Sequence, residues 1–325
     1  MLDRQNNLYT SNSKEKKRYL ITYSLWFFIP ILLISGIMEV LTLNIPTNYK
    51  KNSAYFNESK SEIELIALGS SQMDGAINPE FLDKSSICLA SSSQHHKLDF
   101  TILKQLSTST KKLKYVVLEL SNSHLELPHN SKDFWKNAVY LKFFNVNAFD
   151  RKTYFKDELI YIANPDLYTR MITDYYIRDN YDIELNKFGF NTNSFDGSFP
   201  LNDFNEDIIS KLTTTPNQKR NTEIFKNNTA YLFSMIEYME AHNLQTIICT
   251  LPLYKTYTAN LNSTIVKRRD SVISVIKNRY PNVIFMETEK DPNFKITDFN
   301  NANHLNPDGS KKFTLLLNAI VNKLD

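Results

Sequence analysis

The chain has 325 residues, of which 42% are hydrophobic and 22% are charged, and this globular composition excludes a disordered, collagenous or coiled-coil protein. Basic residues number 38 against 35 acidic ones, and the first 18 residues alone supply the excess, so the remainder is neutral and predicts no binding of nucleic acid. With only six glycines and no glycine-rich phosphate-binding or HExxH motif, we expect no cofactor and no metal.

An uncharged run of twenty residues, from Tyr19 to Met38, follows the basic tail. At about 1.5 Å per residue, a helix of this length spans a hydrocarbon core of about 30 Å. A cleaved signal peptide is the alternative, but the run is longer than its usual apolar region and no A-x-A-like cleavage site follows. Because four basic residues precede the run, the positive-inside rule predicts a cytoplasmic N-terminus and an extracytoplasmic body. We expect a single-pass membrane protein with a tail over 1–18, an anchor over 19–43 and a polar linker over 44–62.

The body over 63–325 alternates short apolar runs with helical patterns, which predicts an α/β fold. We expect a flavodoxin-like three-layer sandwich with a mostly parallel sheet. The predicted strands cover 63–68, 86–90, 114–120, 246–251 and 282–286, and the predicted helices cover 97–106, 222–242, 263–280 and a final segment that Asn306 caps. The aromatic, polar stretch 128–215 lacks strand patterns, and we interpret it as a helical insertion. Cys88 and Cys249 lie in apolar runs and are expected to be free, buried thiols, with a disulfide between them as the alternative.

Polar residues follow the first three predicted strands, at the edge where open parallel sheets bind ligands. Gly69, Ser70 and Ser71 follow the first strand, 91–94 the second and 121–124 the third, and His304 lies just before the last helix. A serine, hydrogen-bond donors and a histidine at one edge are the parts of a nucleophile activated by a base. The alternative is that the two serines only cap the following helix.

These segments resemble the SGNH (GDSL-like) hydrolase superfamily, in particular a membrane-anchored bacterial branch similar to the teichoic-acid D-alanyl transfer protein and to partners of polysaccharide O-acyltransferases. ALGSSQMDGAINPEFL resembles the first sequence block of the family, LASSSQ the second and HLNPDGSKKF the fifth, and TLPLYKTY also resembles this branch. The resemblance covers about 65–125 and 245–320 and leaves the middle of the chain unmatched.

The resemblance implies that Ser71 is the nucleophile and His304 the general base. It also implies that the oxyanion is bound by the Ser71 amide, by a backbone amide near Ser93, where the family usually has glycine, and by Asn122. For Asn122, an ordinary turn asparagine is the alternative.

The family pattern D-x-x-H implies an aspartate three residues before the histidine, where this chain has Asn301. An asparagine accepts a hydrogen bond from the histidine ring but does not offset the charge of an imidazolium, and Asp298 is the alternative partner for the ring.

Two functions follow from the resemblance. The first is an extracytoplasmic serine esterase or O-acyltransferase that acts on a cell-envelope glycan through an acyl-Ser71 intermediate. The second is a catalytically impaired glycan-binding or scaffold protein, marked by Asn301. The expected partners are an acylated cell-envelope polysaccharide or acyl donor, a membrane-bound O-acyltransferase, and the membrane itself through 19–43.

Overall fold

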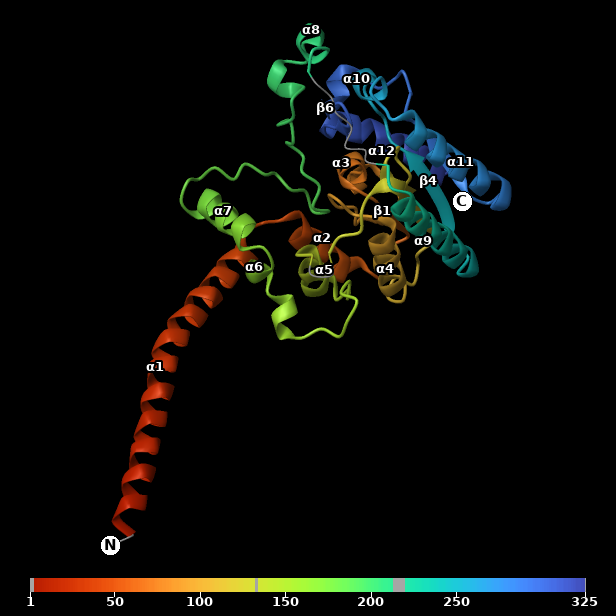
Figure 1. Ribbon diagram of the computed structural model, residues 1–325. Helices are drawn as coiled ribbons and strands as arrows, with labels where there is room; N and C mark the ends of the chain where they lie inside the picture. Colours follow the sequence, from red (N-terminus) through yellow and green to blue (C-terminus); the bar gives the residue numbers. More distant parts are fainter. Residues whose placement is uncertain (1–2, 132–133, 213–219, 325) are drawn as a thin grey trace. The chain divides into compact units, whose positions relative to one another are not determined.

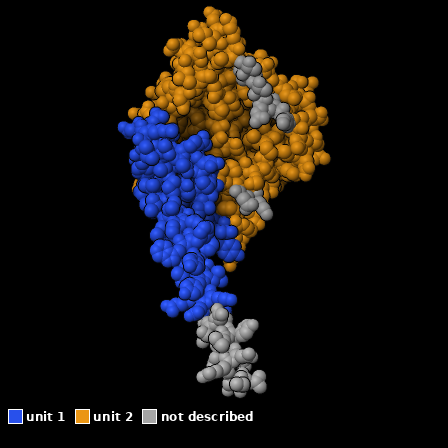
Figure 2. Space-filling model, turned by 60° about the vertical axis from the view of Figure 1, so that its left-hand side comes forward, with its two compact units in different colours: residues 1–45, 154–181 blue, residues 46–153, 182–325 orange. Residues whose placement is uncertain are grey.

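The computed structural model describes residues 3–131, 134–212 and 220–324, with side chains from residue 15 onward (Figure 1). The chain divides into two compact units, residues 1–45 with 154–181 and residues 46–153 with 182–325 (Figure 2). The predicted insertion over 128–215 therefore contributes to both units.

The first unit contains the long helix α1 (Asp3–Asn44), the 3-10 turn η3 (Phe155–Glu158) and the helices α6 (Ile160–Ala163) and α7 (Pro165–Tyr176). Both α6 and α7 contact α1. The segment Glu15–Asn44 of α1 is long and apolar enough to cross a membrane. The uncharged run 19–38 gives this segment apolar side chains on all sides, and such a helix requires an apolar environment.

The second unit is built on five parallel strands in the order β2-β1-β3-β4-β5, which confirms the predicted α/β fold. Successive side chains point to opposite faces of the strands. Ile66, Leu68 and Val116 enter one hydrophobic core, whereas Leu65 and Ala67 enter a second core on the other face. The strands are β1 (Leu65–Leu68), β2 (Ser86–Cys88), β3 (Tyr115–Glu119), β4 (Gln245–Thr250) and β5 (Ile284–Glu287).

Helices cover both cores, so the unit has three layers, as expected. The first core includes side chains of α2 (Asn48–Ser59), α4 (His96–Leu106), α5 (Lys136–Phe144), α9 (Thr222–Ala241) and α11 (Ser263–Arg279). The second core includes α3 (Ser71–Ala76) and α12 (Pro307–Val321). The Asn306 side chain caps α12, accepting from the backbone N–H groups of Asp308 and Gly309, as predicted. Cys88 and Cys249 are free and buried, also as predicted.

The polar stretch that we expected to be a linker forms α2 instead. Thr47 caps this helix, and Asn52, Ser53 and Phe56 form a buried face one turn long. The spacing of these residues places them on the side of the helix that packs on the body. Because this buried face is one turn long and the segment is mostly polar, the sequence shows no helical apolar pattern here. The remaining short elements of this unit are η1 (Pro79–Phe81), η2 (His124–Glu126), η4 (Pro200–Asn202), α8 (Glu206–Ile209), α10 (Lys255–Thr258), η5 (Ile296–Asp298) and the antiparallel pair β6 (Phe299–Asn301) and β7 (His304–Leu305).

Candidate active site

Ser71 begins α3 directly after the turn that ends β1. The preceding Gly69 lies against Glu119: a Cβ on this glycine would be 2.6 Å from the Cβ of Glu119, so no other residue fits without displacing β3. Ser70 caps the helix, since its Oγ accepts from the backbone N–H of Gln72 at 3.4 Å. The two serines therefore have different contacts. Ser70 caps the helix, whereas the hydroxyl of Ser71 contacts His304.

The Ser71 Oγ lies 2.9 Å from Nε2 of His304, which the β6–β7 pair brings to α3. The other ring nitrogen, Nδ1, lies 3.0 Å from Oδ1 of Asn301. That Oδ1 also accepts the backbone N–H groups of Asn303 and His304, each at 3.1 Å. Because backbone N–H groups only donate, the oxygen rather than the nitrogen of the Asn301 amide occupies this position. The ring must then donate from Nδ1, which leaves Nε2 free to accept the serine proton.

Burial lowers the pKa of His304 below its usual value of 6.5, and the negative charge of Glu119 opposes this shift more weakly. The ring is therefore neutral at pH 7, which is the form that a general base requires.

Asp298 does not contact the histidine ring. Its Oδ2 accepts from the backbone N–H of Lys295 at 2.6 Å and from Nζ of Lys312 at 2.5 Å. The carboxylate thus closes η5 and pairs with α12, while Asn301, in the hairpin that carries His304, reaches the ring. Of the two candidates from the sequence, Asn301 is the one whose side chain contacts the histidine ring.

The two remaining candidate residues follow β2 and β3, whose carboxyl ends flank that of β1 because all three strands are parallel and adjacent. Ser93 is exposed and has a left-handed backbone with φ of 62°, the conformation that favours glycine, which the resemblance leads us to expect there. Asn122 is 2% exposed, and neither atom of its side-chain amide has a hydrogen-bond partner among the described residues. A buried, unpaired amide is costly unless a ligand supplies the missing partner.

Glu119, at the end of β3, is a site residue that the sequence reasoning missed. Its side chain is 1% exposed and accepts from Ser70 N at 2.6 Å, Ser70 Oγ at 2.9 Å and Ser121 Oγ at 2.5 Å. The carboxylate therefore holds the turn before Ser71 against the loop after β3. The available signal was a single acidic residue within the apolar run KYVVLEL.

Lys136, the first residue of α5, was also missed because it lies in the predicted insertion. Its Nζ donates to Ser91 Oγ at 2.6 Å and to the Ser92 carbonyl at 2.5 Å, which fixes the loop after β2. Burial lowers its pKa to about 8, and the negative charge of Asp74 opposes that shift. Burial likewise raises the pKa of Asp74 to about 6, and the charge of Lys136 opposes it.

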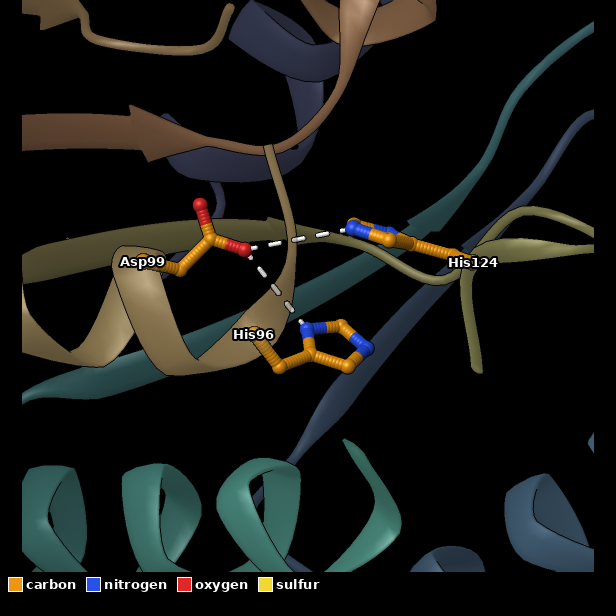
Figure 3. Close-up of side chains that lie close together, drawn as sticks. All are labelled: His96, Asp99 and His124. Carbon is orange, nitrogen blue, oxygen red and sulfur yellow. Dashed lines mark ion pairs between the residues drawn. The ribbon is translucent and has the colours of Figure 1, made fainter. Parts of the chain in front are cut away.

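Three buried side chains, His96, Asp99 and His124, have nitrogen and oxygen atoms within 4.8 Å of one another, a spacing compatible with metal binding (Figure 3). However, both ring nitrogens of His124 face backbone carbonyls, Glu119 O at 3.0 Å and Gln94 O at 3.2 Å. The two rings are tilted against each other, with centroids 4.2 Å apart and planes 32° apart. His124 therefore fits a hydrogen-bonded connection between the loops after β2 and β3, whereas neither ring nitrogen of His96 has a hydrogen-bond partner among the described residues.

No family model matches this sequence, and no curated protein does. Among solved structures, the chain is similar to a protein assigned as an acylhydrolase from Bacteroides fragilis, with 11% identity and a TM-score of 0.40 over 85% of this chain and 98% of that one. It is also similar to a GDSL-like lipase from Bacteroides thetaiotaomicron, with 10% identity and a TM-score of 0.39 over 84% of this chain and 98% of that one.

Proposed function

We propose that the protein is a serine acyl-ester hydrolase or O-acyltransferase of the SGNH type. The observation that carries this proposal is the chain of contacts from Ser71 Oγ through both nitrogens of His304 to Asn301 Oδ1. It supplies a hydroxyl, a neutral base and a group that selects the base-competent tautomer.

In the proposed reaction, Ser71 Oγ attacks the carbonyl carbon of an ester while its proton passes to His304 Nε2. The oxyanion that forms accepts hydrogen bonds from the backbone N–H of Ser71, which has no intrahelical acceptor at the first position of α3, from the loop at Ser93 and from the Asn122 amide. The ester C–O bond then breaks, and Nε2 protonates the leaving alcohol. Water or an acceptor hydroxyl repeats these steps in reverse to release the acyl group from Ser71.

We expect the neutral Asn301 to reduce turnover less than the Asp-to-Asn substitutions of serine proteases do. In those variants the histidine adopts the wrong tautomer, and turnover falls about 10⁴-fold. The two backbone N–H groups that Oδ1 accepts keep the oxygen facing the ring. Compared with an aspartate, Asn301 lacks only the negative charge that would stabilise the imidazolium. The charge of Glu119 favours the protonated ring and supplies part of that stabilisation.

The proposed location is the outer side of a bacterial membrane, with α1 as the anchor and residues 1–18 in the cytoplasm. The apolar segment of α1 and the basic residues before it support this orientation. At that location the substrate class is an acylated cell-envelope polysaccharide or another acyl donor, and a membrane-bound O-acyltransferase is the proposed partner.

The second candidate is a catalytically impaired glycan-binding or scaffold protein, and the neutral Asn301 is the observation that favours it. A fluorophosphonate probe, which reacts with activated serines, separates the two. We expect labelling of the full-length wild-type protein, none of Ser71→Ala, and strongly reduced labelling of His304→Ala. If folded wild-type protein labels no more than Ser71→Ala, the hydrolase proposal fails and the scaffold function replaces it.

A further inference from the structure

The segment 154–181 of the first unit carries large apolar side chains that are exposed to solvent. Phe155 is 78% exposed and Ile177 is 76% exposed, values unusual for such side chains in a folded segment. Four others are exposed to a lesser extent, namely Tyr154 at 62%, Ile162 at 51%, Tyr176 at 43% and Tyr175 at 37%. The same segment has a buried face formed by Ile160, Tyr168 and Ile172, so its exposed side chains belong to a folded element.

Specific hydrogen bonds attach this segment to α1. The two carboxylate oxygens of Glu39 accept the backbone N–H groups of Ile160 at 2.9 Å and Tyr161 at 2.8 Å. These groups lie at the start of α6, where N–H groups have no acceptor within the helix. At the end of α7, the Tyr176 hydroxyl donates to the Leu41 carbonyl at 3.1 Å. Both ends of the α6–α7 pair are therefore fastened to α1 over residues 39–41.

These attachment points lie directly after the uncharged run 19–38 of α1. In a helix that crosses a bilayer, this position is the boundary between hydrocarbon and water, on the side opposite the basic tail. Tyrosine and other amphipathic aromatic residues are enriched at that depth. Figure 1 shows α6 and α7 beside the same end of α1, as the hydrogen bonds require.

We propose that segment 154–181 lies in the outer interfacial layer of the bilayer, with its exposed aliphatic and aromatic side chains inserted among the lipids. This inference rests on the proposed anchor role of α1. The hydrogen bonds to Glu39 and Leu41 would hold the segment at this depth.

Charge indicates which lipids this surface contacts. The segment has five acidic residues and three basic ones, so anionic headgroups do not attract it. The contact is therefore apolar, and we expect it to form on neutral phosphatidylcholine and to persist at high salt.

Single-cysteine labelling of the full-length protein tests this proposal. The native thiols of Cys88 and Cys249 are buried with raised pKa values, so they do not compete for a maleimide fluorophore. Phe155→Cys and Ile177→Cys place the label on the proposed surface. Val275→Cys in α11, 46% exposed in the other unit, is the matched control, and Leu33→Cys reports on the span itself.

In phosphatidylcholine vesicles with nitroxides near the headgroup, we expect the labels at 155 and 177 to be quenched several-fold more than the label at 275. The label at 33 should respond to nitroxides deep in the acyl chains. Quenching at 33 without quenching at 155 and 177 would overturn the interfacial proposal while leaving the anchor intact. Energy transfer between labels at 155 on separate copies, without quenching, would show that a second copy covers the surface instead. Absence of quenching at 33 would contradict both the proposed membrane anchor and the interfacial position that depends on it.

Discussion

At the scale of single residues, the oxygen of the Asn301 amide accepts three donors, two from the backbone and one from the His304 ring. An alanine at 301 removes the acceptor and frees the ring tautomer, whereas an aspartate keeps the acceptor and adds a negative charge. The two substitutions therefore separate orientation from electrostatics.

We expect Asn301→Asp to increase kcat/KM for an activated acetyl ester about tenfold, because the carboxylate stabilises the imidazolium that forms during attack. The same charge raises the pKa of His304, so the acidic limb of the pH profile should move to higher pH. Asn301→Ala should lower turnover by about 10²-fold or more.

The control for this prediction is Asp298→Asn. Asp298 contacts Lys295 and Lys312 rather than the ring, so its substitution should leave the acidic limb in place. A profile that moves with Asp298→Asn and not with Asn301→Asp would reverse the assignment.

The pH dependence of the wild-type protein follows from the buried ring of His304. Burial lowers its pKa, so protonation of the base occurs below pH 6.5. We expect kcat/KM to rise through a midpoint below this value and to be level at pH 7 to 8. Steady-state hydrolysis across this range measures the midpoint, and an acidic limb centred above pH 7 would contradict the neutral-base assignment.

At the scale of elements, Glu119 connects β3 to the turn between β1 and α3 through two hydrogen bonds with Ser70, and a third, from Ser121, joins it to the loop after β3. Ser71, the proposed nucleophile, is the next residue after this turn, so its position depends on a carboxylate from a neighbouring strand. Lys136, at the start of α5, holds the loop after β2 in place by hydrogen bonds to Ser91 and Ser92. The loops at the edge of the sheet are thus held by buried charged side chains.

We expect Glu119→Gln to lower the rate of probe labelling of Ser71 and to destabilise the protein by about 1–3 kcal/mol, because the new amide presents N–H groups to donors. The matched control is Glu287→Gln, at the end of β5, where the carboxylate is exposed and pairs with Lys277. That substitution should change the free energy of unfolding by less than about 0.5 kcal/mol. Equal effects of both would show that Glu119 has no special role in the turn.

At the scale of the whole molecule, the sequence and α1 together predict one membrane crossing with the C-terminus outside. Alkaline phosphatase, which folds only outside the cytoplasm, should be active when fused after Asp325. A fusion after Arg18, before the uncharged run, should be inactive. An inactive fusion at Asp325, with an active cytoplasmic reporter at the same site, would contradict the orientation.

The sequence by itself determined the features that depend on local pattern. Short apolar runs mark buried parallel strands such as β1 and β4, and Asn306 with Pro307 marks the start of α12. The polar residues at the strand ends follow from the same pattern, because adjacent parallel strands bring their carboxyl ends to one edge. The resemblance of their segments to the SGNH blocks implied Ser71 and His304 as a pair, and the structure has them in contact at 2.9 Å.

Only the tertiary structure decided between Asn301 and Asp298, since both lie within six residues of His304 and the hairpin determines which side chain reaches the ring. It alone showed that Glu119 is a buried acceptor, because its donors come from another strand end and loop. It also placed 154–181 on α1 through Glu39, more than a hundred residues away along the chain. These features depend on contacts between distant segments, and such contacts leave no periodic signal in the sequence of either partner.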